Sequence, residues 1–295
     1  MSFERSWNAA LRAAILASLA IAFPAAAQSS GGPPAPDPAA GGSFLDRPYS
    51  LTIGAGAAYL PSYEGSNDYV LSPAGAAFGK IDGFSFSTRG TSLSIDLIRD
   101  PKDAAVTFEL GPVVSLRMDR HSHIKDPQVA ALGRIGRAVE LGGFVGIAKS
   151  RLIDPYDSLG VRLTWQHDIS GVHRSAIWTP EIQYQTPVSL KTYVLLDAQA
   201  NHVGAGYART YFSVTPLGSL ASGLPVYNAR AGWKDYRLAL LVGQVLVGDL
   251  RRPHLSLFAG VSYSRELGSA RNSPIVAIAG SPDQWLAAGG LAYTF

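Results

Sequence analysis

The last eight residues, 288–295, have the sequence AGGLAYTF. Leu291, Tyr293 and Phe295 alternate there with small or hydroxyl-bearing residues. Successive side chains of a β-strand point to opposite faces of a sheet. This period predicts a strand with one face of large apolar side chains and one face of small ones.

The same two-residue period recurs upstream. The clearest runs are Leu51–Tyr59, Thr91–Ile98, Leu159–Ile169 and His254–Tyr263. Turn-forming pairs such as Asp82-Gly83 separate the runs. Many runs have about 9–11 residues, the length that crosses a bilayer when a strand is tilted. We expect about a dozen strands, near residues 50–60, 69–79, 83–98 (one or two strands), 105–118, 138–149, 158–169, 175–185, 191–201, 226–236, 237–248, 254–265 and 285–295.

The composition fits strands that face lipid on one side. Of the 295 residues, 47% are hydrophobic and only 16% are charged, whereas soluble proteins carry about 25% charged residues. No run of 18 apolar residues follows the first segment, so no spanning helix is expected. The chain has no cysteine, which removes disulfides and thiolate sites, and its net charge of +3 is too small to indicate a nucleic-acid partner.

We therefore predict an all-β fold: a single transmembrane antiparallel up-and-down β-barrel of about 12 strands, with 10 or 14 as alternatives. A soluble β-sandwich would also alternate, but long strands, low charge and an aromatic last strand favour the barrel. That last strand, with Leu291, Tyr293 and Phe295 on one face, resembles the signal read by the outer-membrane insertion machinery. It predicts a place in the Gram-negative outer membrane, in contact with its lipid.

The first 46 residues differ from the rest. Residues 1–27 read as a signal peptide, with Arg5 and Arg12 before the apolar run Ala13–Phe23 and an A-x-A site at Ala25–Ala27. Residues 28–46 are rich in Pro and Gly and predict a flexible periplasmic tether. The barrel is expected over residues 47–295.

Several segments resemble the MipA/OmpV family of outer-membrane proteins (MltA-interacting protein). The most distinctive is Pro61-Ser62-Tyr63-Glu64-Gly65-Ser66, which is similar to the family's P-x-Y-E-G-S signature. Weaker matches follow in family order at Gly111–Val113, Glu140–Gly142, Tyr211–Val214, Ser222–Tyr227, Asn272–Ile275 and Gly290–Phe295.

The resemblance implies a scaffold that links a lytic transglycosylase to a peptidoglycan synthase at the outer membrane. Pore, uptake and adhesion roles are alternatives, and a barrel enzyme is a further one. One segment departs from the family pattern: Met118–Arg137 is basic where members often have an acidic loop. A cation-linked role of that loop is therefore not expected.

The motif residues Pro61, Tyr63, Glu64, Gly65 and Ser66 are the candidate site. Glu64 has two interpretations, a contact with a partner or ion, or a structural carboxylate that accepts hydrogen bonds from the following turn, 65–67. We favour the structural one, because Gly and short polar side chains form such turns.

No catalytic, cofactor or metal site is predicted. Two groups of residues have the types that such sites use: an H-x-H pair that could bind a metal, and a grouping of Ser, His and Asp as in hydrolases. Their spacing does not by itself orient the side chains. The residues are His121 and His123 for the first group, and His167, Asp168, Ser170, His173 and Ser175 for the second.

Polar residues on the second face of the strands are expected to line the barrel interior. They are Asp96, Arg162, Gln166, Glu181 and Gln183. A polar interior does not imply an open pore, because side chains fill barrels of this size.

Overall fold

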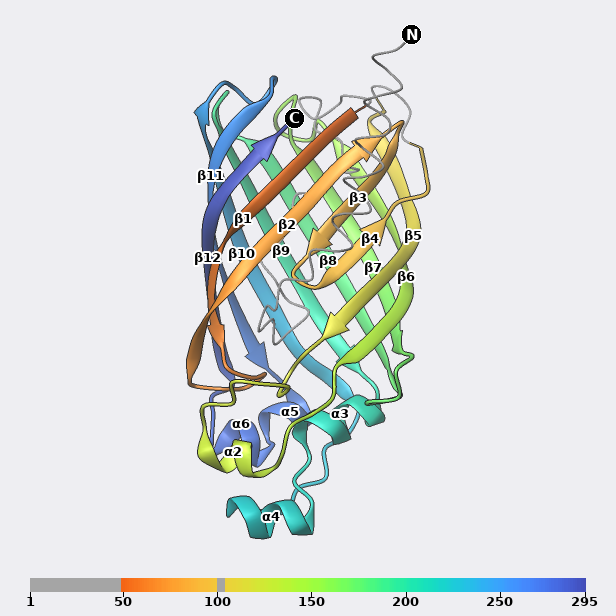
Figure 1. Ribbon diagram of the computed structural model, residues 1–295. Coiled ribbons are helices and arrows are strands. Elements are labelled where there is room, and N and C mark those ends of the chain that lie inside the picture. The colour runs from red at the N-terminus through yellow and green to blue at the C-terminus, as the bar shows by residue number, and fades with distance from the viewer. Residues whose placement is uncertain (1–48, 100–103) are drawn as a thin grey trace, which may run out of the picture.

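A computed structural model describes residues 49–99 and 104–295 as a closed antiparallel barrel (Figure 1). Each strand pairs with its neighbours in the chain, and β1 pairs with β12 to close the wall. The predicted fold class and the predicted number of twelve strands are confirmed for these residues. The strands are β1 (Tyr49–Pro61), β2 (Tyr69–Ile81), β3 (Phe84–Arg89), β4 (Ser92–Ile95), β5 (Val106–Arg117), β6 (Ala138–Ser150), β7 (Ser158–Asp168), β8 (Ala176–Pro187), β9 (Thr192–Val203), β10 (Gly232–Val247), β11 (His254–Glu266) and β12 (Asp283–Thr294).

One pair of predicted strands is wrong. Residues 226–236 and 237–248 are not two strands, since β10 alone covers 232–247 and residues 226–231 precede it in a loop. Tyr227 is extended there because its backbone pairs with that of Val214 in the same loop. Residues 83–98, by contrast, contain both β3 and β4. The predicted signal peptide and tether, 1–46, lie outside the described residues.

The two-residue period separates the two faces of the wall. On β12, Leu286 and Ala288 are buried inside the barrel, while Leu291 and Tyr293 are 49% and 42% exposed on the outside. Buried and exposed residues alternate strictly along most of β5. Apolar side chains therefore form the outer surface, which is the arrangement of a barrel that contacts lipid.

Outward aromatic side chains gather at both ends of the strands, as in the interfacial girdles of membrane barrels. One girdle contains Tyr59, Trp165, Trp178, Trp233 and Trp285, and the other contains Tyr49, Phe84, Phe108, Tyr293 and Phe295. No helix within the described ranges is long and apolar enough to span a membrane.

The two ends of the barrel differ. At one end β2 and β3 are joined by a two-residue turn, 82–83, and β8 and β9 by residues 188–191. At the other end the loops 118–137, 204–231 and 267–282 carry short helices (Figure 1), namely α2 (Pro127–Ala131), α3 (Ala205–Phe212), α4 (Pro216–Ser222), α5 (Gly268–Arg271) and α6 (Pro274–Ala277). Bacterial barrels have short periplasmic turns and longer extracellular loops. We therefore assign the helical end to the cell exterior.

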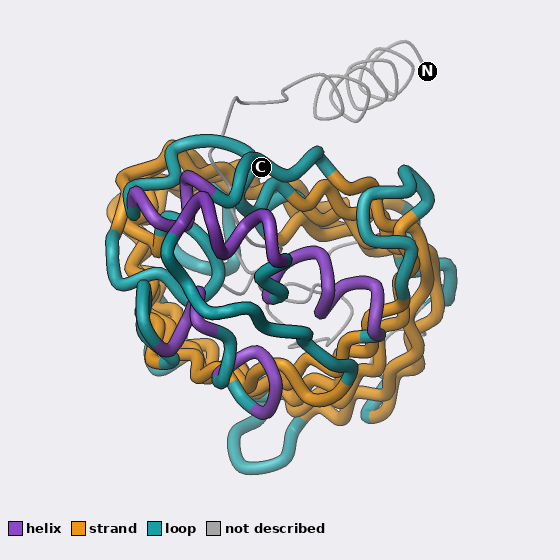
Figure 2. The backbone as a smooth tube through the Cα atoms, turned by 90° about the horizontal axis from the view of Figure 1, so that it is seen from below, coloured by secondary structure: helices purple, strands orange, loops and turns teal. Residues whose placement is uncertain are grey.

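The long loops cover the barrel mouth as a packed cap (Figure 2). Tyr207, Tyr211 and Phe212 of α3 are at most 1% exposed, and Ile275 and Val276 of α6 are fully buried. Burying a large apolar side chain stabilises by about 1.5–3 kcal/mol. The cap is thus held by a hydrophobic core of its own.

The wall is incomplete beside β2. Within the described residues, β2 pairs with β3 only through Phe78–Ile81, although it pairs with β1 along its whole length. The remaining part, Tyr69–Ala77, therefore has an edge without a strand partner. Pro73 lies in this part, and proline is found in sheets at such edges because it has no N–H to donate.

Candidate functional site

The motif segment lies at the capped end, where β1 passes into the loop before β2. Pro61 is the last residue of β1, and the backbone N–H of Ser66 donates to the carbonyl of Tyr63 over 3.0 Å. Gly65 has a φ of +90°, and a Cβ there would lie 2.4 Å from Cγ2 of Val276. The turn therefore requires glycine both for its conformation and for its contact with α6.

Tyr63 anchors this loop in the cap. Its side chain is fully buried in a cluster with Ile275 and Val214, and its hydroxyl donates to the carbonyl of Ala279 over 3.0 Å. Burial raises the pKa of the Tyr63 hydroxyl, so the group stays a neutral donor.

Glu64 is buried and binds three side chains from three other elements. Its carboxylate accepts hydrogen bonds from Arg117 Nη1 at 2.9 Å and from the Tyr207 hydroxyl at 2.6 Å. The ammonium of Lys234 lies 3.0 Å from Oε2. The expectation that the following turn supplies the donors is therefore wrong. The carboxylate joins the β1–β2 loop to β5, α3 and β10 instead.

The charges around Glu64 continue into a buried network. Arg117 also donates through Nε to Glu140 at 2.6 Å, and Glu140 lies 3.1 Å from Nε2 of His173. Lys234 also pairs with Asp235 at 2.8 Å. Breaking a buried ion pair by removing one partner usually destabilises by 3–5 kcal/mol. This network therefore fixes the cap to the upper wall of the barrel.

Asp119, beside Glu64, is only partly hydrogen-bonded within the described residues. Its Oδ1 accepts the backbone N–H of Glu64 at 2.8 Å, whereas its buried Oδ2 has no hydrogen-bond partner within the described residues. Burial and the nearby Glu64 carboxylate raise the pKa of Asp119 to about 7. This group therefore titrates near neutral pH.

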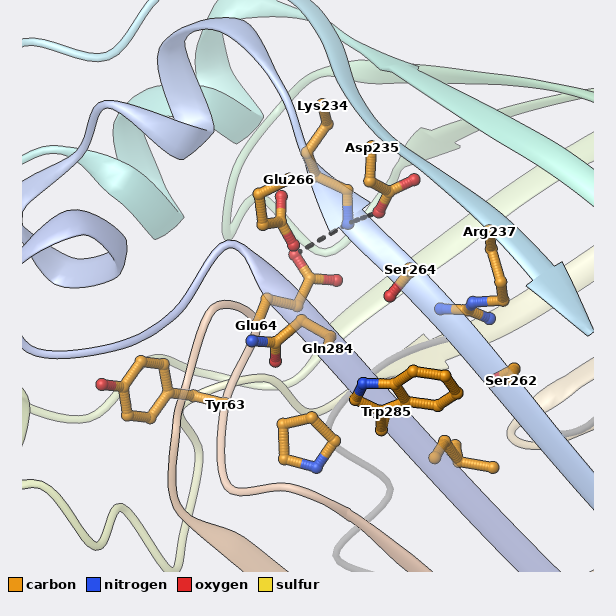
Figure 3. Close-up of a pocket in the computed structure, with 12 residues that line it drawn as sticks. Tyr63, Glu64, Lys234, Asp235, Arg237, Ser262, Ser264, Glu266, Gln284 and Trp285 are labelled. Atoms are coloured by element: carbon orange, nitrogen blue, oxygen red, sulfur yellow. Dashed lines mark ion pairs between the residues drawn. The ribbon is translucent and has the colours of Figure 1, made fainter.

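A pocket opens on the inner side of this network (Figure 3). Tyr63 and Glu64 line it together with residues of β10, β11 and β12. The carboxyl of Glu266 and the amide of Gln284 each place an unpartnered buried oxygen in this region. The motif thus forms one wall of a polar pocket in the barrel mouth.

His121 and His123 make separate local contacts. Nδ1 of His121 lies 3.1 Å from the carbonyl of Ile135, while Nδ1 of His123 lies 3.1 Å from the hydroxyl of its neighbour Ser122. Among the described residues no three His, Asp or Glu side chains converge as metal ligands.

In the grouping of Ser, His and Asp, Asp168 stabilises the turn that follows β7. The Asp168 carboxylate accepts hydrogen bonds from the backbone N–H groups of Ser170, His173 and Arg174. It therefore contacts the backbone of His173 and not its imidazole. The imidazole of His173 faces Glu140 instead. The side chains of Ser, His and Asp are therefore not arranged as a relay.

The predicted interior residues do lie inside, and they are paired. Arg162 binds Glu109 at 2.5 Å, and Glu181 binds Arg89 at 2.6 Å. Gln166 donates to Ser115, Asp96 accepts two backbone N–H groups, and Gln183 is buried. The Arg89–Glu181 ion pair thus joins β3 to β8 across the lumen below the cap, whereas Arg162 and Glu109 pair along the wall between β7 and β5.

The residues of the expected insertion signal lie on the outer face at the short-turn end. Tyr293 and Phe295 meet edge to face at 4.7 Å, and the Phe295 N–H donates to the carbonyl of Leu51. Their recognition by the insertion machinery stays a prediction.

Comparison with known families assigns the chain. The model of the family described as MltA-interacting protein MipA matches residues 53–295. The chain belongs to the MipA family. Family and barrel together place the protein in the outer membrane of a Gram-negative cell, surrounded by lipid. The motif Pro61–Ser66, by which the sequence resembles this family, is the segment that anchors the cap.

No curated protein sequence matches the chain significantly. Among solved structures, similar chains include the COG4313 outer membrane channel from Pseudomonas putida F1, at 11% identity and a TM-score of 0.40, with 86% of this chain and 99% of that chain covered. Another is the Pseudomonas putida toluene transporter TodX, at 10% identity and a TM-score of 0.35, covering 83% and 88%. A third is the outer-membrane expressed OmpT of Vibrio cholerae, at 9% identity and a TM-score of 0.35, covering 84% and 97%. Likenesses at this level carry no argument about function.

The sequence did not reveal the partners of Glu64. Arg117, Tyr207 and Lys234 are separated from it by 53, 143 and 170 positions. In the sequence these residues appear only as single charged or polar residues near the ends of apolar strands. Such positions do not specify which residues form ion pairs with one another.

Proposed function

We propose that this MipA-family barrel is a non-catalytic scaffold that holds a lytic transglycosylase of the MltA type, together with a peptidoglycan synthase, at the periplasmic face of the outer membrane. The name of the family supports a transglycosylase partner. The observation that carries the proposal is an exposed apolar rim at the short-turn end.

This rim consists of Ile153, Val188 and Leu190, which are 87%, 67% and 59% exposed. The loop that presents Ile153 is braced by the fully buried Asp157. Although burial opposes ionisation, backbone N–H groups of Ile153, Leu152 and Asp154 lower the pKa of the Asp157 carboxyl. Apolar side chains on a preorganised loop suit protein binding, because little freedom is lost on association.

The filled interior of the barrel favours the scaffold role rather than an open channel. The cap covers the outer mouth and the Arg89–Glu181 ion pair crosses the lumen, so free axial diffusion is obstructed. In planar bilayers the scaffold predicts a folded but silent protein. Discrete conductance steps from the wild-type protein would favour the pore alternative.

The test is capture of a purified lytic transglycosylase by the full chain in detergent micelles. We expect micromolar or tighter binding, and at least a tenfold loss on changing Ile153 and Val188 together to Asp. The matched control changes Leu217 and Leu220 to Asp, since these two residues of α4 at the opposite end are similarly exposed, at 79% and 85%. Equal losses in both double variants, or no binding by the wild-type protein at micromolar concentration, would contradict the proposal.

A further inference from the structure

The pocket beside Glu64 contains hydrogen-bonding groups that the protein leaves unused. Its floor is the inner face of β11, where Ser262, Ser264 and Glu266 follow one another at every second residue. Side chains at this spacing stand roughly 7 Å apart along the strand. The floor therefore presents a short row of polar groups to the barrel mouth.

One end of the row is an acceptor site. Glu266 is 3% exposed and its Oε2 has no hydrogen-bond partner within the described residues. The nearby ammonium of Lys234 forms ion pairs with Glu64 and Asp235. The neighbouring protein cation thus leaves Oε2 of Glu266 without a hydrogen bond within the described residues.

Gln284 adds a second acceptor at this end. Its Nε2 donates to the carbonyls of Ser66, Ser281 and Asp283. Those carbonyls fix the amide with its nitrogen toward them, and the buried Oε1 is left without a donor. Two unpaired acceptors in one pocket favour a ligand group with several N–H donors, such as a primary ammonium.

A donor site lies beside the middle residue of the row. Arg237 of β10 is opposite Ser264 in the strand register, and Asp235 is opposite Glu266. Figure 3 shows the Arg237 side chain and Glu266 on different sides of Ser264. No hydrogen bond or ion pair engages the guanidinium of Arg237 within the described residues, and this planar group matches a carboxylate.

We propose that this pocket binds a small zwitterion of amino-acid or dipeptide size. Its ammonium would bind Glu266 and Gln284, its carboxylate would bind Arg237, and the hydroxyl of Ser264 would contact the atoms between. A divalent metal fits less well, because no three acidic or imidazole side chains converge in the described residues. The inference does not depend on the scaffold role.

The experiment measures binding of L-alanyl-L-alanine to the full chain in detergent micelles by titration calorimetry. Two matched probes each lack one charge: the N-acetyl dipeptide and the dipeptide amide. We expect saturable binding of the dipeptide and at least tenfold weaker binding of both probes. No saturation up to 10 mM, or equal binding of all three compounds, would overturn the proposal.

Variants assign the two ends of the pocket. Glu266→Gln keeps the size of the side chain, and Arg237→Gln removes the guanidinium, so each is expected to weaken dipeptide binding at least tenfold. The control is Arg265→Gln, since Arg265 lies on the same strand and pairs with Asp283 at the surface. Heat-modifiable gel mobility checks that each variant is folded. Folded Glu266→Gln and Arg237→Gln proteins that bind like the wild type would exclude this site.

Discussion

Replacing Glu64 by Ala is expected to loosen the cap while the barrel stays closed. The change removes the acceptor for Arg117, Tyr207 and Lys234. Hydrogen bonds to charged groups contribute about 1.5–3 kcal/mol each, but Arg117 keeps Glu140 and Lys234 keeps Asp235. Because these partners remain, we expect the free energy of the closed cap to fall by about 3 kcal/mol, which is at the lower end of the range for a broken buried ion pair.

A loss of about 3 kcal/mol raises the opened fraction of the cap about 100-fold. Hydrogen exchange measured by mass spectrometry should show this as faster exchange of α3 and α6 amides, with unchanged protection in β8. Glu181→Ala is the matched control, because it removes a lumen carboxylate bound to Arg89 rather than to the cap. Unchanged exchange of α3 in Glu64→Ala, or an equal change in the control, would refute the assigned role of Glu64.

Three further predictions concern a buried acid, a close backbone contact and the last residue. In the folded state the pKa of Asp119 is raised to about 7 from the unfolded value near 3.9, so its contribution to stability is fully present below about pH 4 and is lost as pH rises to about 7. At about 1.4 kcal/mol per unit of pKa shift, this contribution to the free energy of unfolding is at most about 4 kcal/mol. Chemical denaturation at several pH values should therefore show the stability difference between the wild type and Asp119→Asn falling as pH rises from about 4 to about 7. Parallel pH profiles of the two proteins would argue against it. Gly280→Ala places a Cβ 1.9 Å from the carbonyl oxygen of Gly65, so limited proteolysis should cut the cap at least tenfold faster than in the control Gly160→Ala, whose Cβ would lie 3.6 Å from that of Ala148. Equal rates of cleavage in the two variants would contradict the assigned contact. Phe295→Ser should lower the amount of heat-modifiable protein in outer-membrane fractions several-fold relative to Phe84→Ser, another outward aromatic at the same end, and equal yields would exclude a special role of the last residue in insertion.

The assigned orientation separates the family motif from the proposed scaffold surface. Glu64 and its partners lie at the long-loop end, whereas Ile153 lies at the short-turn end. The motif therefore acts on the cap and on the pocket beneath it. A partner in the periplasm would contact other residues, which explains why variants at the two ends are expected to give different results.

The sequence alone determined the class of fold. Alternation along single strands, as in Leu51–Tyr59 and 288–295, depends only on neighbouring residues, and so it predicted the barrel, its lipid-facing side and the inward position of Arg162 and Glu181. It failed at 226–231, where an extended segment pairs within a loop rather than with the wall. Only the tertiary structure decided the rest: that the long loops pack as a cap, that Glu64 joins its own loop to three distant elements, and that Oε2 of Glu266 has no hydrogen-bond partner within the described residues. The physical reason is that strand periodicity is a local property of the chain, whereas the pairing of buried charges depends on loop conformations that bring residues more than 50 positions apart into contact.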